Sequence, residues 1–479
     1  MLLRSTLIYA PAILLTRLSA LLLLAIATRL VDQTEYGLLA LVVTIGEMTD
    51  TAVTNWLRIS LLRLGGKKDV SRGSLLLAGR VMTMTTIVAL AASAGASVLV
   101  APERWADFAL AVGFYLIAGA VGRFALTVLQ MQQRHSTYSL LEFLRAGLQL
   151  LLPVLAITIL PGSFLAISLG SSLGVLIAGL FAAVLAWRKV VAGPAPFTQR
   201  EFLAFGVPLV VMALVGFGLN NAERLFLNGY YNAGAVAVFA AAYALARQPI
   251  DMVANAINMG AFPEVVGKFD AEGPAAATAL VSKLMALMMR LCLPVAALLI
   301  ALGPYVTAVV LPADYHGHVD RLFAIIAFSV LCANLTTFVY GAIVHAHKRP
   351  WLLVLANGAG SIATISLSLL LIPGMAETGA ALALAGGTLA SLVACLIISE
   401  RLTPVVVPWR DMGISLGIAG ATGLVAVMAS AGLAGAPPLV PLMVGGIAGG
   451  AIFLALNALV HPDETRALTM RLRNRLRSA

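Results

Sequence analysis

The chain has 479 residues, of which 61% are hydrophobic and only 11% are charged, and its mean hydropathy is +0.98. A water-soluble protein of this size needs a polar surface, and the chain contains no long polar stretch, so the composition excludes a soluble protein and a soluble domain on one or two anchors. The net charge of +10 is scattered over short loops and the C-terminal tail without a nucleic-acid-binding motif, which argues against nucleic acid as the partner.

Apolar runs long enough to cross a bilayer as helices, about 20 residues, follow one another along nearly the whole chain. We identify fourteen, and the predicted fold is therefore an all-α polytopic membrane protein with about 14 transmembrane helices. In chain order these runs cover approximately residues 7–28, 37–62, 74–100, 107–131, 138–160, 164–187, 202–227, 233–262, 282–303, 321–344, 351–372, 377–399, 412–432 and 438–460.

A proline-containing polar stretch, Trp187–Glu201, divides these runs into two sets of six followed by one pair. Ala27-Thr28-Arg29-Leu30 closes the first run and the similar Ala222-Glu223-Arg224-Leu225 closes the seventh, which suggests two repeats related by pseudo-two-fold symmetry. The predicted parts are an N-terminal six-helix lobe (1–190), a cytoplasmic linker (191–201), a C-terminal six-helix lobe (202–400), an extra helix pair (411–460) and a basic tail (461–479).

The loop charges predict the orientation. With the N-terminus inside, 20 loop and tail lysines and arginines lie on the cytoplasmic side and three on the other, so both termini are expected in the cytoplasm. Ala25-Ile26-Ala27 also resembles a signal-peptide cleavage site, but Arg17 interrupts the apolar run before it and cleavage would invert the charge bias.

Lys283 and Arg321 lie at the ends of their spans and are counted with the loops; the other basic residues inside the predicted spans are eight arginines, namely Arg17, Arg58, Arg80, Arg123, Arg145, Arg224, Arg247 and Arg290. A charged side chain at the bilayer centre costs about 2.5–3.5 kcal/mol, so eight lipid-exposed arginines would cost about 20 kcal/mol. They must therefore reach an interface, pair with acids or face a polar cavity. A guanidinium binds phosphate with two parallel hydrogen bonds, so the pattern indicates a cationic interior and an anionic, phosphate-bearing cargo.

The acids within the spans are fewer than the arginines: Glu47, Asp50, Glu142, Glu223 and Asp251. Glu142 and Arg145 are three residues apart and are predicted to form a structural ion pair. Arg80 lies close to the cytoplasmic end of its span and is expected to extend to the interface. Arg17 and Arg247 lie furthest from either interface, whereas Arg123 and Arg290 are intermediate.

Residues 202–269 carry the most specific motif. It joins a proline-containing helix that ends in Glu223-Arg224, a helix with Tyr243 four residues before Arg247, and the Phe262-Pro263 pair. Together with Glu35-Tyr36-Gly37-Leu38 near the N-terminus, this stretch resembles the polysaccharide flippases of the multidrug/oligosaccharidyl-lipid/polysaccharide exporter superfamily.

This resemblance implies which residues contact the cargo. In lipid-linked oligosaccharide flippases, cavity arginines on helices one, two and eight bind the carrier's pyrophosphate, and Arg17, Arg58 and Arg247 occupy those helices here. Arg224, Arg290 and Arg123 are secondary candidates.

The resemblance also points to ion coupling. Relatives with a sodium site use an acid on helix seven and Asn-x3-Asp on helix eleven. Glu223 matches the first, but Asn357 is followed by Ser361 instead of aspartate. Glu223, Asn357 and Asp251 are therefore candidates for coupling to H+ or Na+, and no other cofactor is expected.

The resulting hypothesis is a flippase of the bacterial inner membrane rather than an enzyme. It would move undecaprenyl-pyrophosphate-linked oligosaccharide from the cytoplasmic to the periplasmic leaflet for O-antigen, capsule or exopolysaccharide synthesis, by alternating access. Its partners would be membrane lipids and polysaccharide polymerase or chain-length proteins.

One alternative is a multidrug exporter of the same superfamily, which a cationic interior disfavours. Another is a polysaccharide polymerase, ligase or glycosyltransferase, which the short external loops disfavour.

The three cysteines lie in apolar segments without metal-ligand spacing, so no metal site is predicted.

Overall fold

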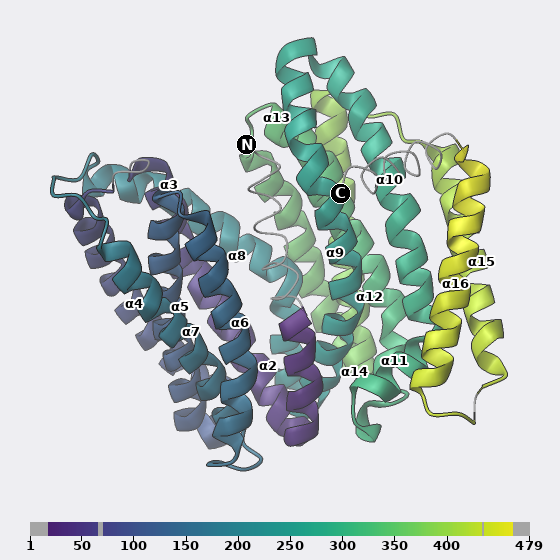
Figure 1. The fold of residues 1–479 in the computed structure, drawn as a ribbon, viewed down its shortest axis with the longest axis horizontal. Helices are drawn as coiled ribbons and strands as arrows, with labels where there is room; N and C mark the ends of the chain where they lie inside the picture. Colours follow the sequence, from purple (N-terminus) through teal and green to yellow (C-terminus); the bar gives the residue numbers. More distant parts are fainter. Residues whose placement is uncertain (1–17, 66–69, 434, 463–479) are drawn as a thin grey trace, which may run out of the picture. The chain divides into compact units, whose positions relative to one another are not determined.

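The computed structural model describes residues 18–65, 70–433 and 435–462. Helices joined by short loops form the described part of the chain (Figure 1). Within it, eleven helices are long and apolar enough to cross a membrane. The predicted class, a multi-pass α-helical membrane protein, is therefore confirmed. Arg17 and the basic tail beyond residue 462 lie outside the described residues.

The number of spans differs from the predicted fourteen, and the difference arises at three places. The first predicted span is described only as the short apolar helix Leu18–Leu30. The second is divided by the π-helical turn Thr51–Asn55. Two further spans, the eleventh and twelfth, lie within the single 52-residue helix α14 (Trp351–Leu402). The other ten predicted runs each coincide with one long apolar helix.

Helix α14 contains a break that explains this merging. A straight helix of 52 residues would be about 78 Å long, more than twice the thickness of the hydrocarbon layer. Ala376, three residues after Pro373, has φ 46° and ψ −125°, a conformation outside the helical region. The two helical segments on either side of Ala376 correspond to the two runs that the sequence predicts.

Contacts divide the chain into two compact units. Unit 1 comprises Met1–Ala241 and Ser361–Gly387, and unit 2 comprises Ala242–Gly360 and Thr388–Ala479. Each is described by itself below. The division into lobes at residues 191–201 stays a prediction.

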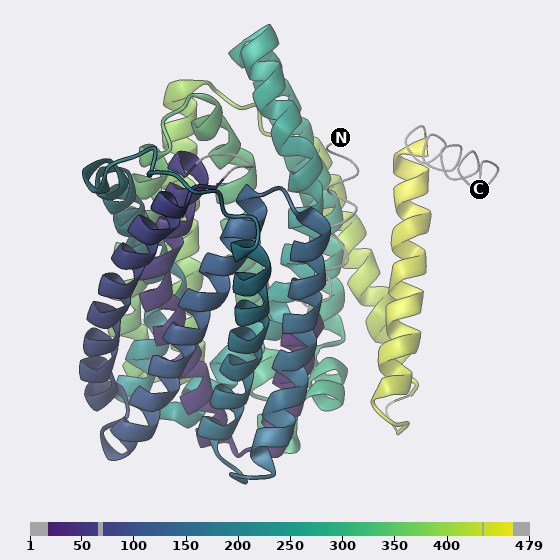
Figure 2. The same cartoon turned by 60° about the vertical axis from the view of Figure 1, so that its left-hand side comes forward.

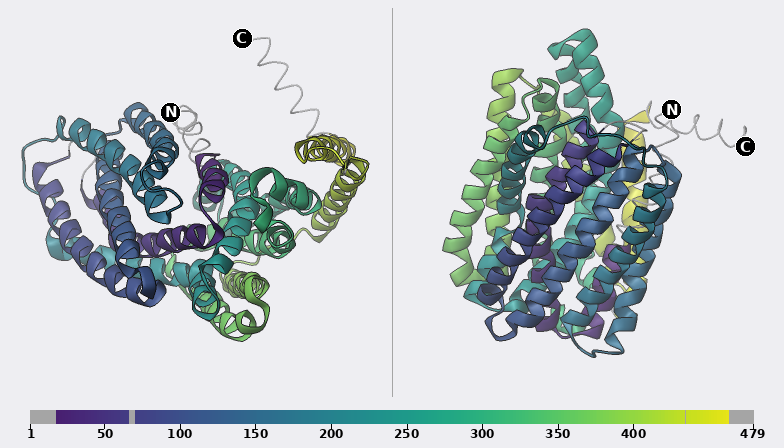
Figure 3. Two further views of the ribbon diagram at one scale, coloured as in Figure 1. Left: turned by 90° about the horizontal axis from the view of Figure 1, so that it is seen from below. Right: turned by 90° about the vertical axis from the view of Figure 1, so that its left-hand side faces the viewer.

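Unit 1 is a helix bundle in which α5 contacts α2, α3, α4, α6 and α7. Both α5 and α6 pack along α7, and α2 contacts α5, α7 and α8 (Figures 1 and 3). Its helices are Leu18–Leu30, α2 (Gln33–Asp50), α3 (Trp56–Leu64), α4 (Arg72–Val100), α5 (Trp105–Met131), α6 (His135–Ile157), α7 (Phe164–Trp187), α8 (Gln199–Tyr230), the start of α9 (Ala233–Glu272) and the middle of α14 (Ser361–Gly387).

Unit 2 contains the rest of α9 and the C-terminal helices. Helix α15 packs against both α10 and α16, and α15 and α16 run side by side (Figure 2). The remaining helices of this unit are α10 (Pro274–Ala301), α11 (Gly303–Val310), α12 (Val319–Asn334), the π-helical turn Leu335–Tyr340, α13 (Gly341–Ala346), the two ends of α14, α15 (Trp409–Ala431) and α16 (Leu439–Val460).

Helix α9 is longer than the span predicted for it. The predicted run ends at the Phe262-Pro263 pair, but the helix continues through Pro263 to Glu272. Its 40 residues correspond to about 60 Å, so part of α9 extends beyond a 30 Å hydrocarbon layer.

Helix starts in unit 1 follow local sequence signals. Thr198 and Glu201 form a capping box at α8, in which the threonine hydroxyl accepts from the Glu201 amide and the glutamate accepts from the Thr198 amide. The Asp32 carboxylate caps α2 by accepting from the Glu35 amide at 2.8 Å. These caps satisfy backbone N–H groups that have no partner within the helix.

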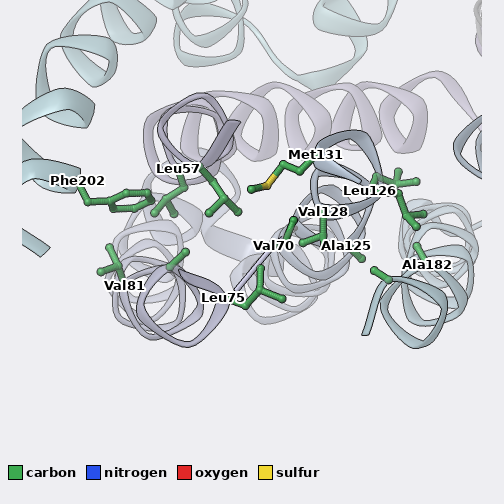
Figure 4. Close-up of a cluster of buried hydrophobic side chains, with 14 of the residues drawn as sticks. Leu57, Val70, Leu75, Val81, Ala125, Leu126, Val128, Met131, Ala182 and Phe202 are labelled. Atoms are coloured by element: carbon green, nitrogen blue, oxygen red, sulfur yellow. The ribbon is translucent and has the colours of Figure 1, made fainter. Parts of the chain in front are cut away.

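A buried hydrophobic cluster in unit 1 brings together Leu57 of α3, Met131 of α5 and Phe202 of α8 (Figure 4), and aromatic side chains within it join α3 and α8. Trp56 is only 4% exposed, and its ring centroid lies 5.7 Å from that of Phe202, which stacks on Phe197 at 5.1 Å. Gly206 faces the same indole: a Cβ atom there would lie 1.9 Å from the Trp56 ring. The close approach of α8 to Trp56 thus requires glycine at this position.

We expect Trp56→Ala to lower the free energy of unfolding by about 3–5 kcal/mol, because it leaves a cavity against Phe202 and Gly206. Trp105→Ala is the matched control, since Trp105 is 50% exposed in the same unit. Denaturation of both purified variants in detergent measures the difference. Equal stability of the two variants would show that the cluster does not hold α3 against α8.

Candidate functional site

The polar groups on α9 form a connected network around Arg247 in unit 2. The Arg247 Nε lies 2.8 Å from Asp251 Oδ2, and one terminal nitrogen donates to the Tyr243 hydroxyl. The guanidinium carbon also lies 5.2 Å from the centroid of the Tyr243 ring. Residues 243, 247 and 251 are four apart, so one face of a helix brings them together. The Arg247 side chain remains 40% exposed.

Asp251 is the most constrained member of this network. Its second carboxylate oxygen accepts a hydrogen bond from Asn334 Nδ2 of α12 at 3.1 Å. Its side chain is only 10% exposed. The carboxylate is thus fixed by an arginine on one oxygen and an amide on the other, and it partly neutralises Arg247.

A second arginine–acid group lies in unit 1 at the end of α2. Arg123 of α5 approaches Asp50 at 2.5 Å, and the aspartate side chain is 9% exposed. Arg58, on the other side of the π-helical turn, also interacts electrostatically with Asp50. The Arg58 side chain is exposed. Asp50 is therefore paired with Arg123, while the nearby Arg58 is exposed.

The Glu223-Arg224 pair is buried in unit 1. Glu223 is fully buried and Arg224 is 8% exposed. One terminal nitrogen of Arg224 donates to the Thr44 hydroxyl of α2 at 3.1 Å, and that hydroxyl donates to the Ala40 carbonyl at 2.8 Å. Arg224 is thus tied to α2 by a polar chain of buried groups.

A polar cavity of about 260 Å³ lies among α5, α6 and α7 of unit 1. Glu142, Arg145 and Gln149 line it from successive turns of α6. Arg145 lies 2.6 Å from Glu142 and donates to Gln149 at 2.6 Å, which confirms the predicted structural ion pair. Arg123 lines the same cavity from α5.

The other residues singled out from the sequence are distributed over both units. Arg80 is exposed on α4. Arg290 lines a cavity of about 390 Å³ in unit 2, together with Lys283, Asp411 and His461. The Asn357 side-chain oxygen accepts from the Ser391 hydroxyl at 3.0 Å. Arg17 lies outside the described residues.

Ser361, the residue four positions after Asn357, has its own structural partner. Its hydroxyl donates to the Val215 carbonyl at 2.6 Å. Among the described residues, no three His, Cys, Asp or Glu side chains lie close enough together to hold a metal ion.

Three residues that take part in these polar contacts could not be assigned that role from the sequence. Thr44 and Asn334 contact Arg224 and Asp251 across more than 80 positions of the chain. Glu35 pairs with Arg104 and accepts from the Phe164 amide at 2.7 Å, which links the ends of three helices. Spacing along one helix carries no signal for such long-range contacts.

The architecture is similar to that of several solved transporters. A lipid II flippase, MurJ, in an inward closed conformation matches with a TM-score of 0.69 and 12% identity, covering 96% of this chain and 100% of the other. An inward-facing multidrug resistance transporter of the MATE family matches with a TM-score of 0.56 and 17% identity, covering 83% and 94%. A transporter of the MOP superfamily from Pyrococcus furiosus matches with a TM-score of 0.53 and 15% identity, covering 83% and 97%.

The chain therefore has the fold of the multidrug/oligosaccharidyl-lipid/polysaccharide (MOP) transporters. A family model described as polysaccharide biosynthesis protein matches residues 2–266, more than half of the 479 residues. The chain belongs to this polysaccharide biosynthesis family. A comparison with curated proteins gave no match.

We expect Thr44→Val to lower the free energy of unfolding by about 1–3 kcal/mol, because a buried Arg224 N–H loses its acceptor. Thr44→Ser keeps the hydroxyl and serves as the control. Denaturant titration of both variants in detergent checks this. A Thr44→Val protein as stable as the serine variant would contradict the importance of this bond.

Proposed function

We propose that the protein is a flippase that moves an undecaprenyl-pyrophosphate-linked oligosaccharide from the cytoplasmic to the periplasmic leaflet of the bacterial inner membrane, for synthesis of a cell-surface polysaccharide. The observation that carries this proposal is the family match over residues 2–266, which contains Arg17, Arg58 and Arg247. The similarity of fold to a lipid II flippase over nearly the whole chain supports a lipid-linked cargo.

The chemistry of Arg247 suits a pyrophosphate that must be bound and then released. A guanidinium has five N–H donors in a planar fork. Asp251 and Tyr243 occupy part of that fork, while 40% of the side chain stays exposed. The exposed donors are available to phosphate oxygens, and the nearby carboxylate lowers the net charge of the site. Binding is therefore moderate, as transport requires.

Arg58 supplies the same chemistry from the first half of the chain. It is exposed, and the nearby Asp50 carboxylate is paired with Arg123, which neutralises much of its charge. Arg17 is assigned to the cargo by the family resemblance alone. Arg224 and Arg123 are secondary candidates, because they are tied to Thr44 and Asp50. Arg290, the third secondary candidate from the sequence, lines a cavity whose other lining residues do not include Arg58 or Arg247.

The energetics define what the flippase must provide. The polyprenyl tail can stay in the bilayer, whereas the pyrophosphate and sugars lose their hydration in hydrocarbon. Arginine hydrogen bonds replace that hydration along the path. Alternating access between inward- and outward-open states then releases the headgroup on the far side. The cargo changes leaflet without a covalent bond being made or broken. Polysaccharide polymerase and chain-length proteins are the expected downstream partners.

Ion coupling is assigned to the buried acids. Glu223 is fully buried beside Arg224, a setting in which gain or loss of H+ or Na+ changes the local charge balance. Asp251 is the second candidate, and Asn357 the third. Because Ser361 replaces the aspartate of the sodium-dependent pattern, we favour H+ over Na+.

The main alternative is a multidrug exporter of the same superfamily, because the fold also matches that of a MATE-family transporter. Accessible arginines repel cationic drugs, and the family match is to polysaccharide biosynthesis. The flippase is therefore favoured.

We expect Arg58→Lys and Arg247→Lys each to reduce flipping of a pyrophosphate-linked lipid oligosaccharide at least about tenfold, because lysine keeps the charge but loses the bidentate geometry. Proteoliposomes with the wild-type and variant proteins provide the measurement. Arg80→Lys is the matched control, since Arg80 is exposed on α4 and is expected to reach the interface. Wild-type rates for both site variants would remove these residues from cargo binding.

Glu223→Gln is expected to make flipping independent of an imposed proton gradient, because glutamine cannot exchange a proton. The same proteoliposomes, with and without a pH difference, test this. A variant that still responds to the gradient as the wild type does would exclude Glu223 as the coupling group.

A further inference from the structure

The cavity around Arg290 in unit 2 is separate from the network around Arg247 and Asp251. Its volume is about 390 Å³, and it is lined by residues of α10, by the start of α15 and by His461, which directly follows α16. A cavity of this size falls within the range of small-ligand sites. Arg290 lies outside the family-matched residues 2–266.

The lining is cationic. Lys283 and Arg290 are seven residues apart on α10, which places both on one face of the helix, about 10 Å apart along its axis. His461 adds a third basic group, and Asp411 is the carboxylate of the lining. Lys283 and Arg290 give an excess of one positive charge over Asp411, and a charged His461 raises this to two.

The positions of the lining residues along their helices indicate how deep the cavity lies in the membrane. Asp411 lies in the first turn of α15, and His461 follows the last residue of α16, so the cavity opens at the ends of two apolar helices. Trp409, at the start of α15, is 74% exposed, as expected for an aromatic side chain at the headgroup level. The positive-inside count assigns these helix ends to the cytoplasmic side.

The two helices whose ends meet at the cavity, α15 and α16, also expose large apolar side chains. Leu416 is 63% exposed, Leu454 66% and Leu459 76%. These side chains can accept acyl chains, while the cavity accepts a headgroup. Serine hydroxyls of Ser282 and Ser415 also line the cavity and provide hydrogen bonds for headgroup oxygens.

We propose that this cavity binds the headgroup of an anionic phospholipid of the cytoplasmic leaflet, with its phosphodiester between Lys283, Arg290 and His461. Basic pockets between transmembrane helices on the cytoplasmic side suit such headgroups. Asp411 faces the same space and accepts hydrogen bonds from headgroup hydroxyls, as phosphatidylglycerol would offer. Arg290 is thereby assigned to a lipid site rather than to the transported cargo. This assignment is independent of the proposed flippase activity.

The test uses the full-length protein in detergent, titrated with phosphatidylglycerol or phosphatidylcholine and followed by native mass spectrometry. We expect tighter binding of phosphatidylglycerol. The double variant Lys283→Gln/Arg290→Gln should weaken it about 30-fold, because each basic residue near an anionic headgroup contributes about fivefold. Arg80→Gln, which removes an exposed arginine from α4, should leave it unchanged.

A variant that gains affinity is a second test, because a misfolded protein would lose lipid binding rather than gain it. Asp411→Asn removes the opposing charge but keeps a side-chain oxygen that accepts hydrogen bonds from the headgroup hydroxyls, so it is expected to tighten phosphatidylglycerol binding about fivefold. Equal affinity for the two lipids, or equal binding by the wild type and the double variant, overturns the proposal. Displacement of phosphatidylglycerol by glycerol phosphate at equal concentration also overturns it, because the site would then bind a soluble phosphate rather than a lipid.

Discussion

The cost of placing a guanidinium inside a membrane governs the polar interior of this protein. At about 2.5–3.5 kcal/mol for each residue at the bilayer centre, arginines in apolar helices need a partner or access to water. The seven described arginines meet this requirement in four ways. Arg145, Arg123 and Arg247 pair with Glu142, Asp50 and Asp251. Arg224 reaches a buried hydroxyl. Arg290 lines a polar cavity, and Arg58 and Arg80 are exposed.

The same constraint gives the arginines different capacities for function. An arginine enclosed by partners, such as Arg145, has its donors committed to Glu142 and Gln149. Arg247 is held by Asp251 and Tyr243 but keeps 40% of its side chain exposed. It combines a fixed position with free surface, which a transient anion site requires. A cationic interior moderated by acids can bind a pyrophosphate without trapping it.

Much of the fold could be predicted from the sequence, because a helix that spans a bilayer needs a long apolar run and local caps. Ten of the predicted runs coincide with single helices. The sequence did not reveal the π-helical turn after Asp50 or the continuation of α9 past Pro263, because hydropathy identifies only apolar runs: the turn lies inside such a run, and the continuation of α9 is rich in charged residues. In the site, spacing predicts contacts within one helix, as for Glu142 and Arg145. Contacts between helices, such as Asn334 with Asp251, leave no periodic signal.

The most direct test of the proposed function is the sidedness of the lipid-linked oligosaccharide in cells that lack this protein. A probe that reaches only the periplasmic face, for example a periplasmic ligase, reports how much of it has crossed the membrane. The flippase account predicts accumulation on the cytoplasmic face after deletion, and recovery when the wild-type chain is restored. Unchanged sidedness after deletion, with no second flippase present, would contradict it.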